Sequence, residues 1–371
     1  MQKKLIALAV AGLISGGAFA QSNVVVYGIV DVAVDSVNLG DGSKTRISSG
    51  GLMTERLGFR GTEALGNGLN ANFNLEMGLG TDRGTNTGAL TAATSTAYML
   101  FDRLATLGLS GNWGSLNVGR QYSPSFNVKA SSDAFNFAGV GTNASMWQGT
   151  TRVNNSVRYD SPSMSGFTFA ALYGMGDQGG GATNNAESAG GQTAVANNKN
   201  SGRHVGLNLR YANGPVSVGY GYGVNDSVTL VGTNTVKTKT NNLAATYDFG
   251  VAKLWAGWNT YKNDAAPVTV DNRVYSIAVT APVGAGTVKV QYGNLNEKLA
   301  ADTDTNQWSL GYVHPMSKRT NAYATWTRYD NKGGVGRGAA FASGALVGNG
   351  AAVADTTYDP SALQVGLNHS F

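Results

Sequence analysis

Hydrophobic and polar residues alternate along most of this chain. Between Leu69 and Met77, Glu76 and three asparagines fall on one side, and apolar residues fall on the other. The same two-residue period recurs in five further segments: Val24–Asp35, Val205–Tyr211, Val216–Tyr222, Asn242–Phe249 and Val288–Tyr292. This period is typical of β-strands with one face against apolar surroundings and the other against water. The pattern therefore predicts an all-β protein.

Two kinds of connection separate the predicted strands. Seven short connections contain Gly, Pro, Asn or Ser, which supply the dihedral angles of turns; they lie at 64–68, 111–114, 161–165, 213–215, 248–250, 282–286 and 315–318. Eight longer connections are predicted at 38–52, 79–98, 122–150, 174–202, 224–240, 262–272, 294–305 and 330–360. Together they divide the chain into sixteen strands. Short turns on one side and long loops on the other are typical of an antiparallel barrel that spans the outer membrane.

The two ends of the chain favour export to a bacterial membrane. Residues 1–20 have the charged start, short apolar run and small-residue site of a secretory signal, so we expect cleavage before Gln21. Residues 21–371 would then form a single barrel domain. The last ten residues alternate in polarity and end at Phe371. This ending resembles the final strand of outer-membrane barrels, whose terminal aromatic residue is read by the assembly machinery.

Composition narrows the class of protein further. Charged residues make up 13% of the chain, against roughly 25% in soluble proteins, as expected for a barrel whose outer face meets lipid. The chain has no cysteine, which excludes disulfides and thiolate metal sites. The net charge of +5 is too small to favour nucleic acid as a partner. We expect no cofactor.

Several arginines lie on the polar phase of their predicted strands. Arg56, Arg60, Arg152 and Arg158 alternate with apolar neighbours. An arginine on the lipid face costs about 2–4 kcal/mol at mid-membrane, so we expect these side chains to line a water-filled lumen. Because arginine stays charged at any working pH, a cluster of them would attract small anions. The alternative is that each arginine pairs with a carboxylate and only stiffens the wall.

Four segments resemble the general porins of β-proteobacteria: Tyr27–Asp31, Arg56–Glu63, Gly119–Pro124 and Asn155–Pro162. The resemblance implies a sixteen-stranded, homotrimeric channel with short periplasmic turns and long extracellular loops. It also implies that the third loop, at about 122–148, folds into the lumen and narrows it.

The resemblance further implies which residues form the pore constriction. These are Arg56, Arg103 and Arg152, with Arg120 at the root of the third loop, and the acidic residues Glu76 and Asp133. Further positions expected to line the lumen are Arg60, Arg158, Asp31 and Lys129. The third loop holds a single carboxylate, that of Asp133. We therefore expect a net preference for anions.

These observations together predict a general diffusion porin that passes small hydrophilic solutes and ions across the outer membrane. Lipopolysaccharide is an expected partner. A substrate-specific channel for a sugar, phosphate or carboxylate stays open, because Trp147 and Phe135 in the third loop would allow it. A barrel enzyme or an adhesin is less favoured. The three histidines are scattered, and the Gly174-x-Gly176-x-x-Gly179 spacing falls in a polar loop without a following helix.

Overall fold

The computed structural model describes residues 23–38, 42–86, 100–176, 202–228, 235–265, 267–268, 270–299, 304–332 and 359–371. The predicted signal, residues 1–20, lies outside these ranges, so its role stays a prediction.

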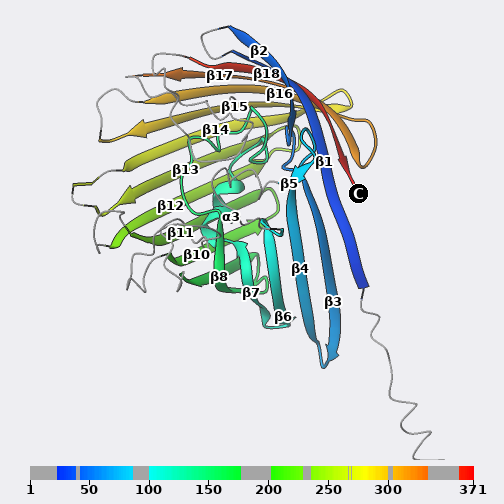
Figure 1. The fold of residues 1–371 in the computed structure, drawn as a ribbon, viewed down its shortest axis with the longest axis vertical. Helices are drawn as coiled ribbons and strands as arrows, with labels where there is room; N and C mark the ends of the chain where they lie inside the picture. Colours follow the sequence, from blue (N-terminus) through cyan, green and yellow to red (C-terminus); the bar gives the residue numbers. More distant parts are fainter. Residues whose placement is uncertain are drawn as a thin grey trace, which may run out of the picture.

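Neighbouring strands pair antiparallel around a closed ring, in which the last strand returns to lie beside the first (Figure 1). Backbone bonds of 3.1 Å in both directions between Gly28 and Phe371 complete this seam.

Almost all of the described elements are strands. They are β1 (Asn23–Asn38), β2 (Ser43–Ser49), β3 (Arg56–Gly66), β4 (Leu69–Gly80), β5 (Thr85–Asn86), β6 (Leu104–Gly111), β7 (Gly114–Tyr122), β8 (Arg152–Asp160), β9 (Phe167–Met175), β10 (Arg203–Asn213), β11 (Val216–Val228), β12 (Thr235–Asp248), β13 (Lys253–Asn263), β14 (Asp271–Val283), β15 (Gly286–Glu297), β16 (Thr305–Pro315), β17 (Thr320–Asn331) and β18 (Ser361–Ser370). The helix α3 spans Pro124–Ala130. No helix in the described ranges is long and apolar enough to cross a membrane.

The labelled strands form sixteen positions in the barrel wall, as predicted. β2 and β3 both pair with β1 and occupy one position, interrupted at 50–55. β5 pairs only with the end of β4. The predicted loop at 38–52 was wrong in part, because β2 occupies about half of it. Arg46 on β2 pairs with Asp35 at 3.3 Å, and charged residues near the end of a strand resemble a loop in the sequence. The predicted loop at 224–240 is shorter, since β11 and β12 extend into it.

The two faces of the wall differ in polarity. Apolar side chains point outward, and Leu209 and Val365, for example, are 53% and 52% exposed. Polar side chains point inward, as Gln364 and Thr327 do. The alternation in sequence therefore reports a lipid face and a lumen face, which is the arrangement of a membrane barrel.

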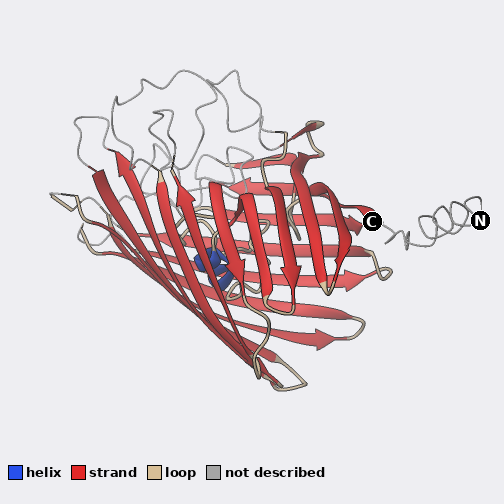
Figure 2. Ribbon diagram, turned by 90° about the horizontal axis from the view of Figure 1, so that it is seen from below, coloured by secondary structure: helices blue, strands red, loops and turns tan. Residues whose placement is uncertain are grey.

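The third loop lies inside the barrel, where α3 is surrounded by strands (Figure 2). Side chains of the wall hold its backbone: Asn208 Nδ2 donates to Pro124 O at 2.9 Å, and Gln307 Nε2 donates to Thr142 O at 2.9 Å. An apolar cluster that includes Met146 fills the space between loop and wall. The loop thus rests against the half of the wall that follows β9 in the chain, and the strands β3 to β8 face it from the other side.

Asp31 organises the short segment that interrupts the wall between β2 and β3. Its carboxylate accepts the backbone N–H groups of Gly51, Leu52 and Met53 at 2.8–3.0 Å, and its side chain is fully buried. This differs from the prediction that Asp31 lines the lumen. The physical reason is that the turned backbone at 51–53 presents three N–H groups that need an acceptor once they are buried.

Candidate functional site

Arginine side chains gather on the inner face of β3, β7 and β8 and at Arg103, directly before β6. Adjacent strands bring them together, since Ala105 on β6 pairs with Arg120 and Tyr122 on β7 pairs with Arg152. The register of β7 shifts between Gly119 and Gln121. Such a bulge re-aims the side chains that follow it. Because of the bulge, Tyr122 and Asn117 both face the lumen. On a regular strand, two residues five positions apart would lie on opposite faces.

Glu76 on β4 is the carboxylate at the centre of this group. It accepts a bond from Arg103 Nε at 2.6 Å and one from the Tyr27 hydroxyl at 2.8 Å, and Arg56 Nη1 lies 3.9 Å away. Glu76 and Arg103 are both buried. A buried carboxylate of this kind needs cationic partners to offset its lost hydration. Glu76 therefore holds the side chains of Arg103 and Arg56 against the wall.

Tyr122 links Arg103 to Arg152. Its hydroxyl accepts bonds from Arg103 Nη2 and Arg152 Nη2, both at 2.8 Å, and the Arg152 guanidinium lies 4.7 Å from the centre of its ring. Arg120 donates to the backbone oxygen of Asp102 at 2.6 Å. We call Arg56, Arg103, Arg120 and Arg152 the arginine cluster. Its four positive charges outnumber the two acidic residues beside it, Glu76 and Asp102, so its net charge is positive.

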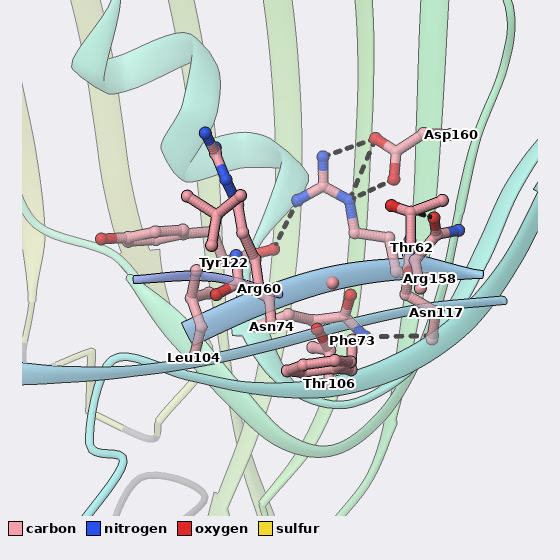
Figure 3. A pocket seen from close by; sticks show the side chains of 14 residues that line it. Arg60, Thr62, Phe73, Asn74, Leu104, Thr106, Asn117, Tyr122, Arg158 and Asp160 are labelled. Carbon is pink, nitrogen blue, oxygen red and sulfur yellow. Dashed lines mark hydrogen bonds and ion pairs between the residues drawn. The ribbon is translucent and has the colours of Figure 1, made fainter. Parts of the chain in front are cut away.

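A polar recess of about 560 Å³ adjoins the arginine cluster (Figure 3). Arg158 and Asp160 face each other there, with contacts from Arg158 Nε of 2.9 and 3.1 Å. Arg60 stacks over the ring of Tyr27 at 5.1 Å and forms no ion pair with a described residue. Hydroxyl and amide groups, among them Thr62, Asn74, Thr106 and Asn117, share the lining with the apolar side chains of Val25, Phe73 and Leu104. The recess therefore adds a further unpaired positive charge to the lumen.

Two predicted lumen residues of the third loop are buried within it. The Asp133 carboxylate accepts N–H bonds from Phe135 at 2.9 Å and Phe137 at 3.1 Å, and it also accepts the Thr142 hydroxyl. Lys129 Nζ donates to Trp147 O at 2.9 Å. Burial raises the pKa of Asp133 and lowers the pKa of Lys129 to about 7. Their burial differs from the prediction that they face the passage, because each satisfies backbone groups of the folded loop.

The structure thus brings together most of the residues that the sequence singled out. Arg56, Arg103, Arg120, Arg152 and Glu76 form one connected group, whereas Asp31, Lys129 and Asp133 are buried apart from it. Tyr27 and Tyr122 were missed. Both lie in the segments that carry the family resemblance, and Tyr27 also shares the polar phase of Asp31 on its strand, so alternation could have found it as well.

Ser123 and His204 form a buried pair at the root of the third loop. Ser123 Oγ lies 3.0 Å from His204 Nε2 and 2.9 Å from Ser125 Oγ. All three side chains are buried, so a substrate cannot reach them. In the described ranges, no group of three or more His, Cys, Asp or Glu could hold a metal ion.

Comparison with known proteins agrees with the fold. The profile of the family described as Gram-negative porin matches residues 7–334. Outer membrane porin protein 32 of Delftia acidovorans is 34% identical over the full length of both chains. An outer membrane porin protein of Bordetella pertussis is 32% identical over 87% of this chain and 93% of that protein.

A solved structure supports the same assignment. The anion-selective porin from Comamonas acidovorans superposes with a TM-score of 0.77 at 30% identity, covering 95% of this chain and 100% of that one. Salmonella typhi OmpF, at 16% identity and a TM-score of 0.67, shares the fold. The chain therefore belongs to the Gram-negative porin family and is an outer-membrane protein.

Proposed function

We propose that this chain is a general diffusion porin that passes small hydrophilic solutes and ions and prefers anions. Concentration gradients drive the flux, and no chemical step is involved. One observation carries the preference for anions: the four arginines of the cluster outnumber the acidic residues beside them, Glu76 and Asp102, while the single carboxylate of the third loop is buried. A fixed positive potential in a confined aqueous passage concentrates anions and repels cations.

The name of the Comamonas acidovorans relative, an anion-selective porin, supports the same preference. The specific-channel alternative relied on Trp147 and Phe135, which would have to face the passage. Both side chains are packed between the third loop and the wall, 2% and 4% exposed. An aromatic path for a sugar cannot be built from them, so general diffusion is favoured.

The test is the reversal potential of purified protein in a planar bilayer under a salt gradient. Replacing Arg56, Arg103 and Arg152 together with glutamine should move this potential toward that of a cation-selective pore. An unchanged potential would mean that the arginines only brace the wall.

A matched control removes three positive charges elsewhere. Arg203, Lys262 and Arg328 lie near the loop ends of their strands and pair with carboxylates at the barrel rim. Replacing these three with glutamine should leave the reversal potential close to that of the unaltered protein. An equal shift in both triple variants would show that net charge, not the cluster, governs selectivity.

The proposal includes a homotrimer. Family membership supports it, and a Vibrio cholerae OmpT structure described as a trimer form shares the fold. Leu107, Leu109, Leu116 and Val118 on β6 and β7 present an apolar surface to the outside. Conductance should appear in groups of three equal steps, and single isolated steps would contradict the trimer. The roles predicted for Phe371 in assembly and for lipopolysaccharide as a partner stay predictions.

A further inference from the structure

The wall that supports the third loop lacks side chains where the loop comes closest. Glycines of five strands face the loop at these points: Gly206 on β10, Gly219, Gly221 and Gly223 on β11, Gly257 on β13, Gly293 on β15 and Gly311 on β16. We call these residues the glycine seat, apart from Gly219, where a Cβ atom would come no closer than 3.4 Å to the loop. α3 lies over the part on β10 and β11, and the rest of the loop lies over the other three strands.

The backbone of α3 approaches the seat too closely for any other residue. A Cβ atom added to Gly221 would lie 2.9 Å from Ser125 Cα and 3.2 Å from Ser125 O. One added to Gly206 would lie 2.9 Å from Cδ of the Pro124 ring. Neither the backbone nor the proline ring can rotate away. A side chain at either position would therefore have to displace the start of the helix.

The remainder of the loop is equally close. A Cβ atom on Gly257 would lie 2.7 Å from Trp147 Cη2 and 2.8 Å from Ser132 Cβ. On Gly311 it would lie 2.7 Å from Phe135 Cε1. These aromatic rings are buried in the packed layer between loop and wall, where a close-packed interior leaves little room to yield.

Backbone conformation does not explain these glycines. None of the seven has a positive φ, so each position could hold an L side chain without strain. Glycine within a strand weakens it, because it adds flexibility to the unfolded chain and has nothing to pack. A close approach of other atoms is the remaining reason for glycine in a strand. The loop supplies it through the backbone of Ser125 at Gly221 and through side chains at the other positions of the seat.

The opposite side of α3 reaches toward the arginine cluster. Phe126 stacks on Tyr122 with ring centres 5.2 Å apart. The Tyr122 hydroxyl in turn accepts hydrogen bonds from Arg103 and Arg152. A helix displaced from the seat would thus move directly toward the cluster. The closer α3 lies to the glycine seat, the wider the passage between α3 and the arginine cluster becomes.

We propose that the glycine seat sets the width of the passage, by letting the third loop lie deep against β10 to β16 and away from the arginine cluster. The inference rests on the proposed function, since it concerns the passage of that same channel. It makes these glycines determinants of the size limit for solutes, although they touch no solute themselves.

The test compares two alanine variants on one strand and one face. Gly221→Ala should lower single-channel conductance and the size of the largest neutral polymer that enters the pore. Gly219→Ala is the matched control, because its Cβ would meet Val128 and Arg210 side-chain atoms at 3.3–3.5 Å, near ordinary contact. Its conductance should equal that of the unaltered protein. Gly257→Ala, on a different strand, should repeat the loss seen for Gly221→Ala.

Each outcome decides the matter. A loss of conductance in the Gly221 and Gly257 variants, with the Gly219 variant unchanged, supports the seat. Unchanged or raised conductance in both would overturn it, as would failure of both variants to fold into heat-modifiable barrels, which would assign the glycines to barrel closure instead. An unaltered protein that forms no channel would refute the proposed function itself, so the two failures are distinguishable.

Discussion

Glu76 shows how a single residue controls the charge of the passage. Its carboxylate is bound by Arg103 and Tyr27, and it is the acidic partner of Arg56. Glu76→Gln should therefore increase the preference for anions, because one negative charge is lost while the arginines keep theirs. The reversal potential under a salt gradient measures this. Glu63→Gln, at an exposed position near the turn end of β3, should change it little, and a shift toward cations in the Glu76 variant would contradict the prediction.

Asp31 should contribute to stability and not to selectivity. Asp31→Ala leaves the N–H groups of Gly51, Leu52 and Met53 without their acceptor, and each such loss costs about 1–3 kcal/mol when the group is buried. Urea unfolding from lipid vesicles should show the decrease in stability. Asp248→Ala, which removes one exposed bond to Gly250, is the control, and equal stabilities of the two variants would refute the role.

At the scale of single residues, the sequence predicted which arginines point inward better than it predicted the residues that contact them. The inward phase of Arg56 and Arg152 followed from alternation alone. The position of Tyr122 did not, because a bulge in β7 changes the phase within one strand. The burial of Asp133 could not be predicted either, since it depends on how the loop folds back on itself, and alternation carries no information about loops.

The third loop is the element that combines these residues into a passage. Its buried Lys129 lies in α3, with the Asp133 carboxylate as the charged group that acts on its pKa. The pKa of Lys129 is about 7, below its ordinary value of 10.5, because burial disfavours the charged form. The loop therefore gains a positive charge as the pH falls through about 7. The raised pKa of Asp133 acts in the same direction at lower pH, since its protonation removes a negative charge.

Anion preference should consequently grow when the pH is lowered from about 8 to about 6, the range in which Lys129 takes up its proton. Lys129→Met keeps an apolar chain of similar length and should lack this part of the pH dependence. Reversal potentials recorded at both pH values in both proteins measure the difference. Equal pH dependence in the two would show that Lys129 keeps one charge state throughout.

At the scale of the whole molecule, alternation predicted the closed wall because each strand faces lipid on one side and water on the other. The seven predicted turns all fall between paired strands. The wall is less uniform than its pattern, however. Tyr323 and Tyr329 point inward and are buried, Tyr323 against Asp31 and Tyr329 against Ser145 of the third loop. Other tyrosines, such as Tyr275, face outward. A tyrosine suits both faces, so its side of the wall is set by tertiary contacts that the sequence does not reveal.

The barrel makes a direct prediction about charge on its two faces. Ile277 is half exposed near the middle of β14 on the outer face, where an arginine would lie in lipid at a cost of about 2–4 kcal/mol. Thr106 lines the polar recess, where an arginine would meet water. Ile277→Arg should therefore lower the free energy of unfolding from lipid vesicles by that amount, and Thr106→Arg should change it little. Since both substitutions add the same side chain to a strand, only the surroundings differ, and equal losses would show that the inner face is not in contact with an aqueous passage.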